Sequence, residues 1–273
     1  MKNLLYITLL LLVFSFVSCE DTVDVPLDTA EPKLVIDASI KWQKGSVGNE
    51  QKIKLTTTTN YYNATVPKVS GATVFVTNSA NVVFTFTEIP DTGEYICTDF
   101  VPVINETYTL TVIHDGVTYK ATDKLYATPE IDSVEQTTVP GFDGDIIQVK
   151  FYYQDNGAED NFYLIGAKNS TKVFPEYGVI DDEFFQGNQM FGFYTDENLK
   201  AGDKLDFGLQ GISERYANYM DKLISISGNQ GGNPFATPPA TLRGNIVNQN
   251  NQDDFPFGYF SLTEIDTLNY TVH

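Results

Sequence analysis

Between residues 34 and 127 the chain alternates apolar and polar residues in short segments, a pattern typical of β-strands. The clearest segment carries Leu110 and Val112 between threonines and is followed by the two-residue turn Asp115-Gly116. This turn predicts a hairpin in which Val112 lies opposite Tyr119. One face of the hairpin is apolar and must pack against other strands. The pattern therefore predicts a β-sandwich over this first region.

A second β-rich domain is predicted for residues 128–273. Thr128-Pro129 breaks the alternation, and a new set of strand-like segments follows it, so we place the domain boundary between residues 127 and 128. One helix is predicted at about 213–227, with Ser213 as its N-cap and Gly228 as its stop. Its apolar stripe is interpreted as core rather than as an interaction surface.

The first residues are typical of a lipoprotein signal peptide. Lys2 precedes an apolar run over residues 4–17, which is too short to span a bilayer, and Ser18-Cys19 follows it. We predict a signal peptide at residues 1–18, a lipid such as palmitate on Cys19, and an acidic, proline-containing tether at residues 19–33. The alternatives are an uncleaved membrane anchor, or an ordinary signal peptide in which Cys19 is incidental.

The net charge of -19 makes a nucleic-acid partner unfavourable, because an acidic surface repels phosphates. Removing residues 1–18 removes Lys2 and no acid, which leaves 16 basic against 36 acidic residues, a net charge of -20. Such a field favours cations or basic partners, although a solvated surface explains it as well. The second cysteine, Cys97, has no partner if Cys19 carries lipid, so it is predicted to be a buried structural thiol.

The sequence contains no recognisable catalytic motif. After the signal peptide the histidines are His114 and His273, and G-x-S-x-G, H-E-x-x-H, P-loop and G-x-G-x-x-G motifs are absent. We therefore predict no catalytic residue, no resident metal and no cofactor. A carboxylate-based glycan hydrolase is the enzymatic alternative, because it needs only two acids at the correct separation. Residues 181–185, Asp-Asp-Glu-Phe-Phe, are the segment considered for it.

A cation site is a weaker prediction. Oxygen-bearing side chains surround a glycine in a predicted hairpin loop, which could bind calcium through Asp155, Asn156, Glu159 and Asp160. The segment lacks the ligand spacing of an EF-hand, and a polar loop explains it equally well.

The long loop at residues 228–241 is rich in glycine and proline and carries Phe235. Phe235 is interpreted either as a packing residue or as an exposed contact for a partner.

Several short segments, taken in order, resemble the DUF4249 family, a family of uncharacterised outer-membrane lipoproteins from Bacteroidota. The segments are Cys19-Glu20-Asp21, Pro32 to Ile36, Val69 to Val74, Gly93-Glu94-Tyr95, Tyr108 to Val112, Ile131 to Val134, Asp155 to Tyr163, Gly244-Asn245-Ile246 and Gly258 to Ser261. The Gly-Ala-x-Val and Gly-x-Tyr steps also resemble immunoglobulin-like or prealbumin-like β-sandwiches, which supports that architecture for residues 34–127.

The resemblance implies a lipid-anchored protein of the outer membrane, surface-exposed rather than facing the periplasm, that works beside a TonB-dependent receptor. It implies no catalytic residues. The function expected from the sequence is therefore that of a non-enzymatic accessory or ligand-binding lipoprotein. A surface glycan hydrolase and a purely structural or adhesive envelope protein are the alternatives.

Overall fold

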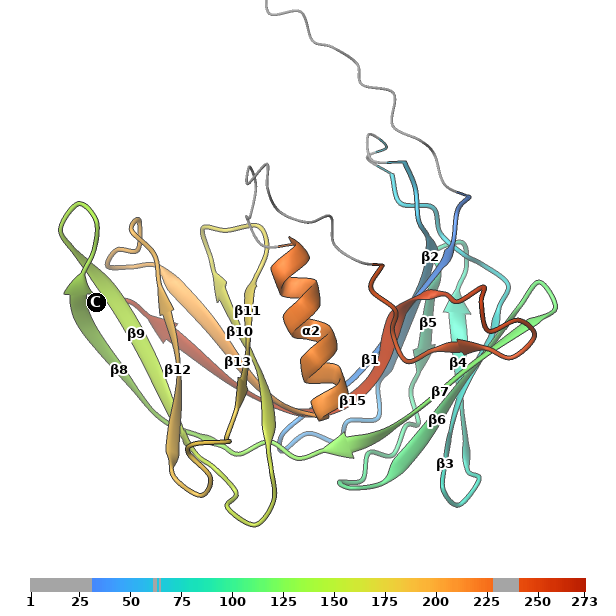
Figure 1. The fold of residues 1–273 in the computed structure, drawn as a ribbon, viewed down its shortest axis with the longest axis horizontal. Coiled ribbons are helices and arrows are strands. Elements are labelled where there is room, and N and C mark those ends of the chain that lie inside the picture. Colours follow the sequence, from blue (N-terminus) through green and yellow to red (C-terminus); the bar gives the residue numbers. More distant parts are fainter. Residues whose placement is uncertain (1–30, 61–62, 64, 228–240) are drawn as a thin grey trace, which may run out of the picture. The chain divides into compact units, whose positions relative to one another are not determined.

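The structure is a computed structural model that describes residues 31–60, 63, 65–227 and 241–273. Residues 32–273 form one compact unit. Its described residues fold mainly into β-strands with one α-helix, and this confirms the predicted β-rich class (Figure 1). None of the helical structure within those residues is long and apolar enough to cross a membrane.

The first part of the unit is a closed sheet of eight strands. Its strands are β1 (Leu34–Gln43), β2 (Gln51–Thr57), β3 (Thr73–Asn78), β4 (Val83–Ile89), β5 (Glu94–Cys97), β6 (Thr107–His114), β7 (Val117–Tyr126) and β15 (Phe257–Thr271). They pair in the order β15-β1-β2-β5-β4-β3-β6-β7. β7 then pairs with β15 again, through Leu262 with Leu125 and Thr263 with Tyr126. The short strand β14 (Val247–Asn248) pairs with β7 as well.

The alternation in the sequence explains the core of this sheet. Ile36, Ala38 and Ile40 alternate with more exposed residues along β1, and each is fully buried in one apolar cluster shared by all eight strands. The predicted hairpin is confirmed, because Val112 pairs with Tyr119 and its neighbours follow the same register.

The closed sheet differs from the predicted sandwich of two separate layers. The reason is the origin of the closing strand. Residues 257–263 of β15 lie far beyond the expected boundary at residue 127, yet they pair in parallel with β1 and contact β7. Ile246, Phe260 and Leu262 accordingly belong to the first core. Residues 34–127 alone therefore lack β15, the strand that joins the edges formed by β1 and β7.

Two facing sheets form the second part of the unit. One contains β8 (Ile131–Pro140), β9 (Asp145–Gln154) and β12 (Gln189–Thr195), in the order β12-β9-β8. The other contains β10 (Phe162–Asn169), β11 (Glu176–Asp181) and β13 (Lys204–Ile212), which continue the large sheet beyond β15. Aromatic contacts join the two layers: the rings of Phe151 and Phe207 lie 5.1 Å apart, as do those of Tyr153 and Tyr163.

β15 belongs to both parts of the unit. Its first half pairs in parallel with β1, and its second half pairs antiparallel with β13 (Figure 1). The predicted helix is present as α2 (Glu214–Ser227), which follows β13 directly. Its buried residues, among them Tyr216 and Met220, pack with Leu164, Ile212 and Tyr259. The apolar stripe is therefore core, as predicted.

A buried carboxylate on β15 connects three segments of the chain. Glu264 is 6% exposed. Its Oε2 atom lies 3.0 Å from Lys44 Nζ, just after β1, and accepts a hydrogen bond of 2.9 Å from the Thr128 backbone N–H, between β7 and β8. The segment between β7 and β8 also contacts β13, because Thr128 Oγ1 donates to the Leu209 carbonyl at 3.3 Å. The connection between the two parts is thus held by a largely buried charged group.

We expect Glu264→Gln to lower the free energy of unfolding by about 2 kcal/mol, because a charge-assisted hydrogen bond and a buried ion pair lose their charge. The matched control is Glu94→Gln, which breaks the exposed Lys52–Glu94 pair at 3.2 Å and should cost less than about 1 kcal/mol. Urea unfolding measures both. Equal losses in the two variants would contradict the role assigned to Glu264.

Candidate functional site

Helix α2 presents a polar face beside β15. Ser213 caps the helix, because its Oγ accepts a hydrogen bond of 3.1 Å from the Tyr216 N–H. Residues three, four and seven positions apart lie on the same side of a helix. The side chains of Arg215, Asn218, Tyr219 and Lys222 therefore follow one another along this face.

The segment after residue 241 forms the opposite side of the site. Gly244 lies against β15 so closely that a Cβ atom on it would be 1.8 Å from the Gly258 carbonyl oxygen. Asn245 then mimics a strand neighbour: its Nδ2 donates to the Phe260 carbonyl at 2.7 Å, and its Oδ1 accepts from the Phe260 N–H at 2.9 Å. These contacts fix the position of Arg243, which precedes them.

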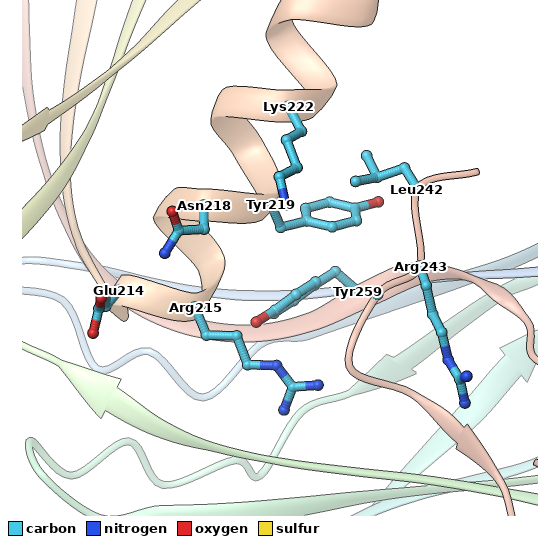
Figure 2. A pocket seen from close by; sticks show the side chains of 9 residues that line it. Glu214, Arg215, Asn218, Tyr219, Lys222, Leu242, Arg243 and Tyr259 are labelled. Atoms are coloured by element: carbon cyan, nitrogen blue, oxygen red, sulfur yellow. The ribbon is translucent and has the colours of Figure 1, made fainter. Parts of the chain in front are cut away.

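A pocket of about 370 Å³ lies between these elements, and we call it the arginine pocket. It is lined by Glu214, Arg215, Asn218, Tyr219, Lys222, Leu242, Arg243, Gly244 and Tyr259 (Figure 2). Arg215 and Arg243 are the only two arginines in the 273-residue sequence. An acidic chain with 17 basic residues thus places both of its guanidinium groups at one pocket.

Tyrosine rings form the back of the arginine pocket. The Tyr259 ring centroid lies 4.7 Å from those of Tyr216 and Tyr219. Burial raises the pKa of the Tyr259 hydroxyl well above its ordinary value, so this group is neutral at physiological pH. Figure 2 shows the Tyr259 hydroxyl directed toward the Arg215 side of the pocket. The surface behind the cations is therefore apolar and neutral.

The cations differ in how they are held. Arg243 donates from Nη2 to the Gln252 carbonyl at 3.0 Å, and its guanidinium lies 4.8 Å from the Phe255 ring centroid. Among the residues that the structure describes, the Arg215 and Lys222 side chains form no ion pair. Donors for an external anion are thus present on both sides of the pocket.

A half-buried acid lies near Arg215. Burial raises the pKa of the Asp123 carboxyl on β7 to about 6, although the Lys124 N–H and the charges of Arg215 and Lys124 oppose that increase. The negative charge beside Arg215 therefore disappears as the pH falls through about 6, and the electrostatic potential near Arg215 becomes more positive.

A second hollow, of about 330 Å³, adjoins the first through Glu214, which lines both. It continues past Tyr126 and Tyr163 toward the loop between β9 and β10, and Glu159 and Asp160 line it. The row of hollows is thus basic near α2 and acidic near this loop.

The described lining of the arginine pocket consists mainly of hydrogen-bond donors and ring surface. Its only carboxylate is Glu214, and none of its nine residues is a serine, cysteine or histidine. A nucleophile with its base, or a pair of acids across a cleft, is what hydrolysis requires. Guanidinium, ammonium and phenol groups provide hydrogen-bond donors and ring surface instead.

Of the residues predicted to bind calcium, Asn156 and Glu159 contact each other, because Asn156 Nδ2 donates to Glu159 Oε1 at 3.4 Å. Asp155 is buried, and its oxygens accept hydrogen bonds from Tyr163 Oη at 2.7 Å and from the Gly187 N–H at 2.8 Å. The other three, Asn156, Glu159 and Asp160, are exposed. Within the described ranges no group of three or more His, Cys, Asp and Glu side chains could hold a metal ion. Asp155 instead joins two neighbouring loops, and the calcium site stays a prediction.

Of the acids in residues 181–185, Asp182 is buried, whereas Asp181 and Glu183 are exposed. Asp182 is 2% exposed, while Phe184 and Phe185 after it are 80% and 53% exposed. A substrate could not reach the Asp182 carboxylate in this arrangement. Two further predicted sites, Cys19 and Phe235, lie outside the described residues.

The arginine pocket was not predicted from the sequence. One signal was available, because the two arginines flank the glycine- and proline-rich loop at residues 228–241. The rarity of arginine does not show which residues lie close together in space, so the pocket could be recognised only from the structure.

Comparisons with known proteins identify a family but no activity. A family model described as Domain of unknown function (DUF4249) matches residues 20–268. No curated protein matches the chain significantly. Among solved structures, the chain is similar to a cytokine receptor complex, with 10% identity, 66% of this chain and 83% of that chain covered, and a TM-score of 0.24. It is also similar to a two-domain fibronectin type III segment of chicken tenascin, with 12% identity, coverages of 67% and 90%, and a TM-score of 0.21.

We expect Asp123→Asn to stabilise the protein at pH 7.5 and to have little effect at pH 4. The native carboxyl, with a pKa of about 6, keeps its proton to higher pH than the unfolded one, so stability falls as pH rises from about 4 to 6. Removing the charge should recover on the order of 1–3 kcal/mol above pH 6.

Chemical denaturation of the two proteins at both pH values measures this difference. Asp132→Asn, at an exposed position of β8, is the control and should change stability little at either pH. A gain from Asp123→Asn that is the same at pH 4 and pH 7.5 would contradict the assignment.

Proposed function

The chain belongs to the DUF4249 family, and we propose that it is a lipid-anchored protein of the outer membrane that binds a ligand without transforming it. In this proposal it acts as an accessory of a TonB-dependent receptor. The observation that carries the binding role is the arginine pocket, which is lined by both arginines of the sequence together with Tyr219 and Tyr259, and by one carboxylate among its described residues.

The sequence supports the anchoring role. An apolar run too short for a bilayer precedes Ser18-Cys19, and the acids of residues 20–31 follow it. The family match begins at residue 20, directly after Cys19, which agrees with residues 1–18 being a leader. A bacterial lipoprotein carries several acyl chains, and stable anchoring needs more than one. Surface exposure and a lipid such as palmitate on Cys19 are part of the same proposal.

A glycan hydrolase is less well supported. Its best candidate segment buries Asp182, and the arginine pocket offers a single carboxylate. An anionic ligand of that pocket would be held by charge and by ring contacts. Its bonds would not lie between two carboxylates, as a scissile glycosidic bond does in a glycosidase. We therefore prefer binding over catalysis.

We expect Cys19→Ser to abolish incorporation of labelled palmitate and to remove the protein from the outer-membrane fraction. Cys97→Ser is the matched control. Cys97 is buried, burial raises the pKa of its thiol to about 11, and its Sγ lies 3.1 Å from an Asp99 oxygen. This unreactive thiol should not be acylated, so the control should label as the wild type does. Palmitate labelling that persists in Cys19→Ser would overturn the anchoring proposal.

The partnership with a receptor has a separate test. Crosslinking of intact cells followed by affinity purification of the wild-type protein should recover a TonB-dependent receptor. Recovery without any envelope partner would contradict the accessory role. Protease treatment of intact cells distinguishes surface exposure from a periplasmic orientation.

A further inference from the structure

We propose that the arginine pocket binds a small organic anion that carries one carboxylate or phosphate group on a ring. The oxyanion would lie between the guanidinium groups of Arg215 and Arg243, and the ring would lie against Tyr219 and Tyr259. This inference deepens the proposed binding function and rests on it for its biological meaning. The chemistry of the pocket can be tested independently of anchoring.

Arginine is rare in this chain, and both arginines lie at the pocket. Arginine presents five N–H donors in a planar fork, which matches the oxygens of a carboxylate or phosphate, whereas lysine presents a point charge. Of the 17 basic residues in the sequence only two are arginines, so every basic position outside the pocket is a lysine. Those two come from different elements, the first turn of α2 and the segment before β14, and both line the same hollow. Solubility or general charge balance does not require that placement.

The cations of the pocket have no acidic partner among the described residues. The chain carries 36 acidic residues, yet among the described residues none forms an ion pair with Arg215, Lys222 or Arg243. Arg243 is fixed from behind by the Gln252 carbonyl and by the Phe255 ring. Such support positions a guanidinium while leaving most of its donors available. In Figure 2 the guanidinium groups of Arg215 and Arg243 extend toward the same side of the pocket.

The tyrosine surface indicates a ring on the ligand. Tyr219 and Tyr259 pack against each other with their centroids 4.7 Å apart, and both line the pocket. Aromatic faces favour flat or apolar partners, and the guanidinium groups beside them favour an anion at its edge. The volume of about 370 Å³ lies at the small end of ligand sites. A ring with one charged substituent fits the aromatic surface, the guanidinium groups and the volume of the pocket.

The surroundings argue against a polyanion. Glu214 lies at the boundary with the acidic hollow, where Glu159 and Asp160 follow. Asp123 lies close enough to Arg215 for the two charges to interact. A chain of phosphates would extend from the basic pocket into this negative region and be repelled. A ligand with a single anionic group avoids that region.

The experiment measures binding by the purified full chain in mild detergent with isothermal titration calorimetry. The probes are phenyl phosphate and benzoate, with inorganic phosphate and phenol as the anion-only and ring-only comparisons. We expect at least one ring anion to bind about tenfold or more tightly than phosphate and phenol, because only it uses both surfaces. Whether phenyl phosphate or benzoate binds more tightly shows which of the two oxyanions the pocket prefers.

Arg215→Gln and Arg243→Gln should each weaken the preferred probe by about tenfold or more. Lys200→Gln, at an exposed turn position outside the pocket lining, is the matched control and should bind as the wild type does. Arg215→Lys keeps the positive charge but lacks the planar guanidinium, so its affinity should lie between those of the wild type and Arg215→Gln. Melting temperatures of all variants verify folding, and Arg215→Lys replaces Arg215→Gln if the latter fails to fold.

Three outcomes would overturn the inference: no binding of either ring anion at concentrations up to about 10 mM, equal affinity for ring anions and phenol, or unchanged affinity in both folded arginine variants. These results are distinguishable from failure of the proposed function. Loss of the receptor in crosslinking leaves the titrations valid, and loss of ring-anion binding leaves anchoring at Cys19 valid.

Discussion

The fold depends on a largely buried carboxylate at the junction of its two parts. Glu264 lies on β15, and the Lys44 ammonium and the Thr128 N–H satisfy its charge. A buried charge is costly unless it is paired and hydrogen-bonded, so the three segments have to meet at one point. The same requirement fixes where β15 leaves β1 and β7 and continues toward β13.

The arginine pocket follows from that position of β15. Helix α2 begins immediately after β13 and packs through Tyr216 on Tyr259, which belongs to β15. The segment carrying Arg243 is held against the same strand, because Gly244 leaves no room between the two backbones. Both walls of the pocket are therefore positioned by their contacts with β15. A ligand that touches both arginines would contact elements that come from separate regions of the sequence.

Local patterns predicted the local structure well. The hairpin containing Val112 and Tyr119 has the predicted register, since a two-residue turn and strict alternation leave one consistent pairing. Helix α2 was also predicted to within about one residue. The pairing of β1 with β15 was not predicted, because the alternation of a strand specifies its faces but not its neighbours. The two arginines meet because α2 and the segment around Gly244 both pack on β15, and no sequence pattern indicates those contacts, so the candidate site could not be predicted either.

The parallel pairing of β1 with β15 has a consequence for the order of folding. Ile36 at the beginning of the described chain pairs with Gly258 near its end, and contacts of such large sequence separation form slowly. A chain that is synthesised or exported from its N-terminus presents β1 to β7 first, as an open sheet with unpaired edges. That sheet closes only when residues 257–263 arrive. The long-range strand therefore delays completion of the fold until the end of the chain is available.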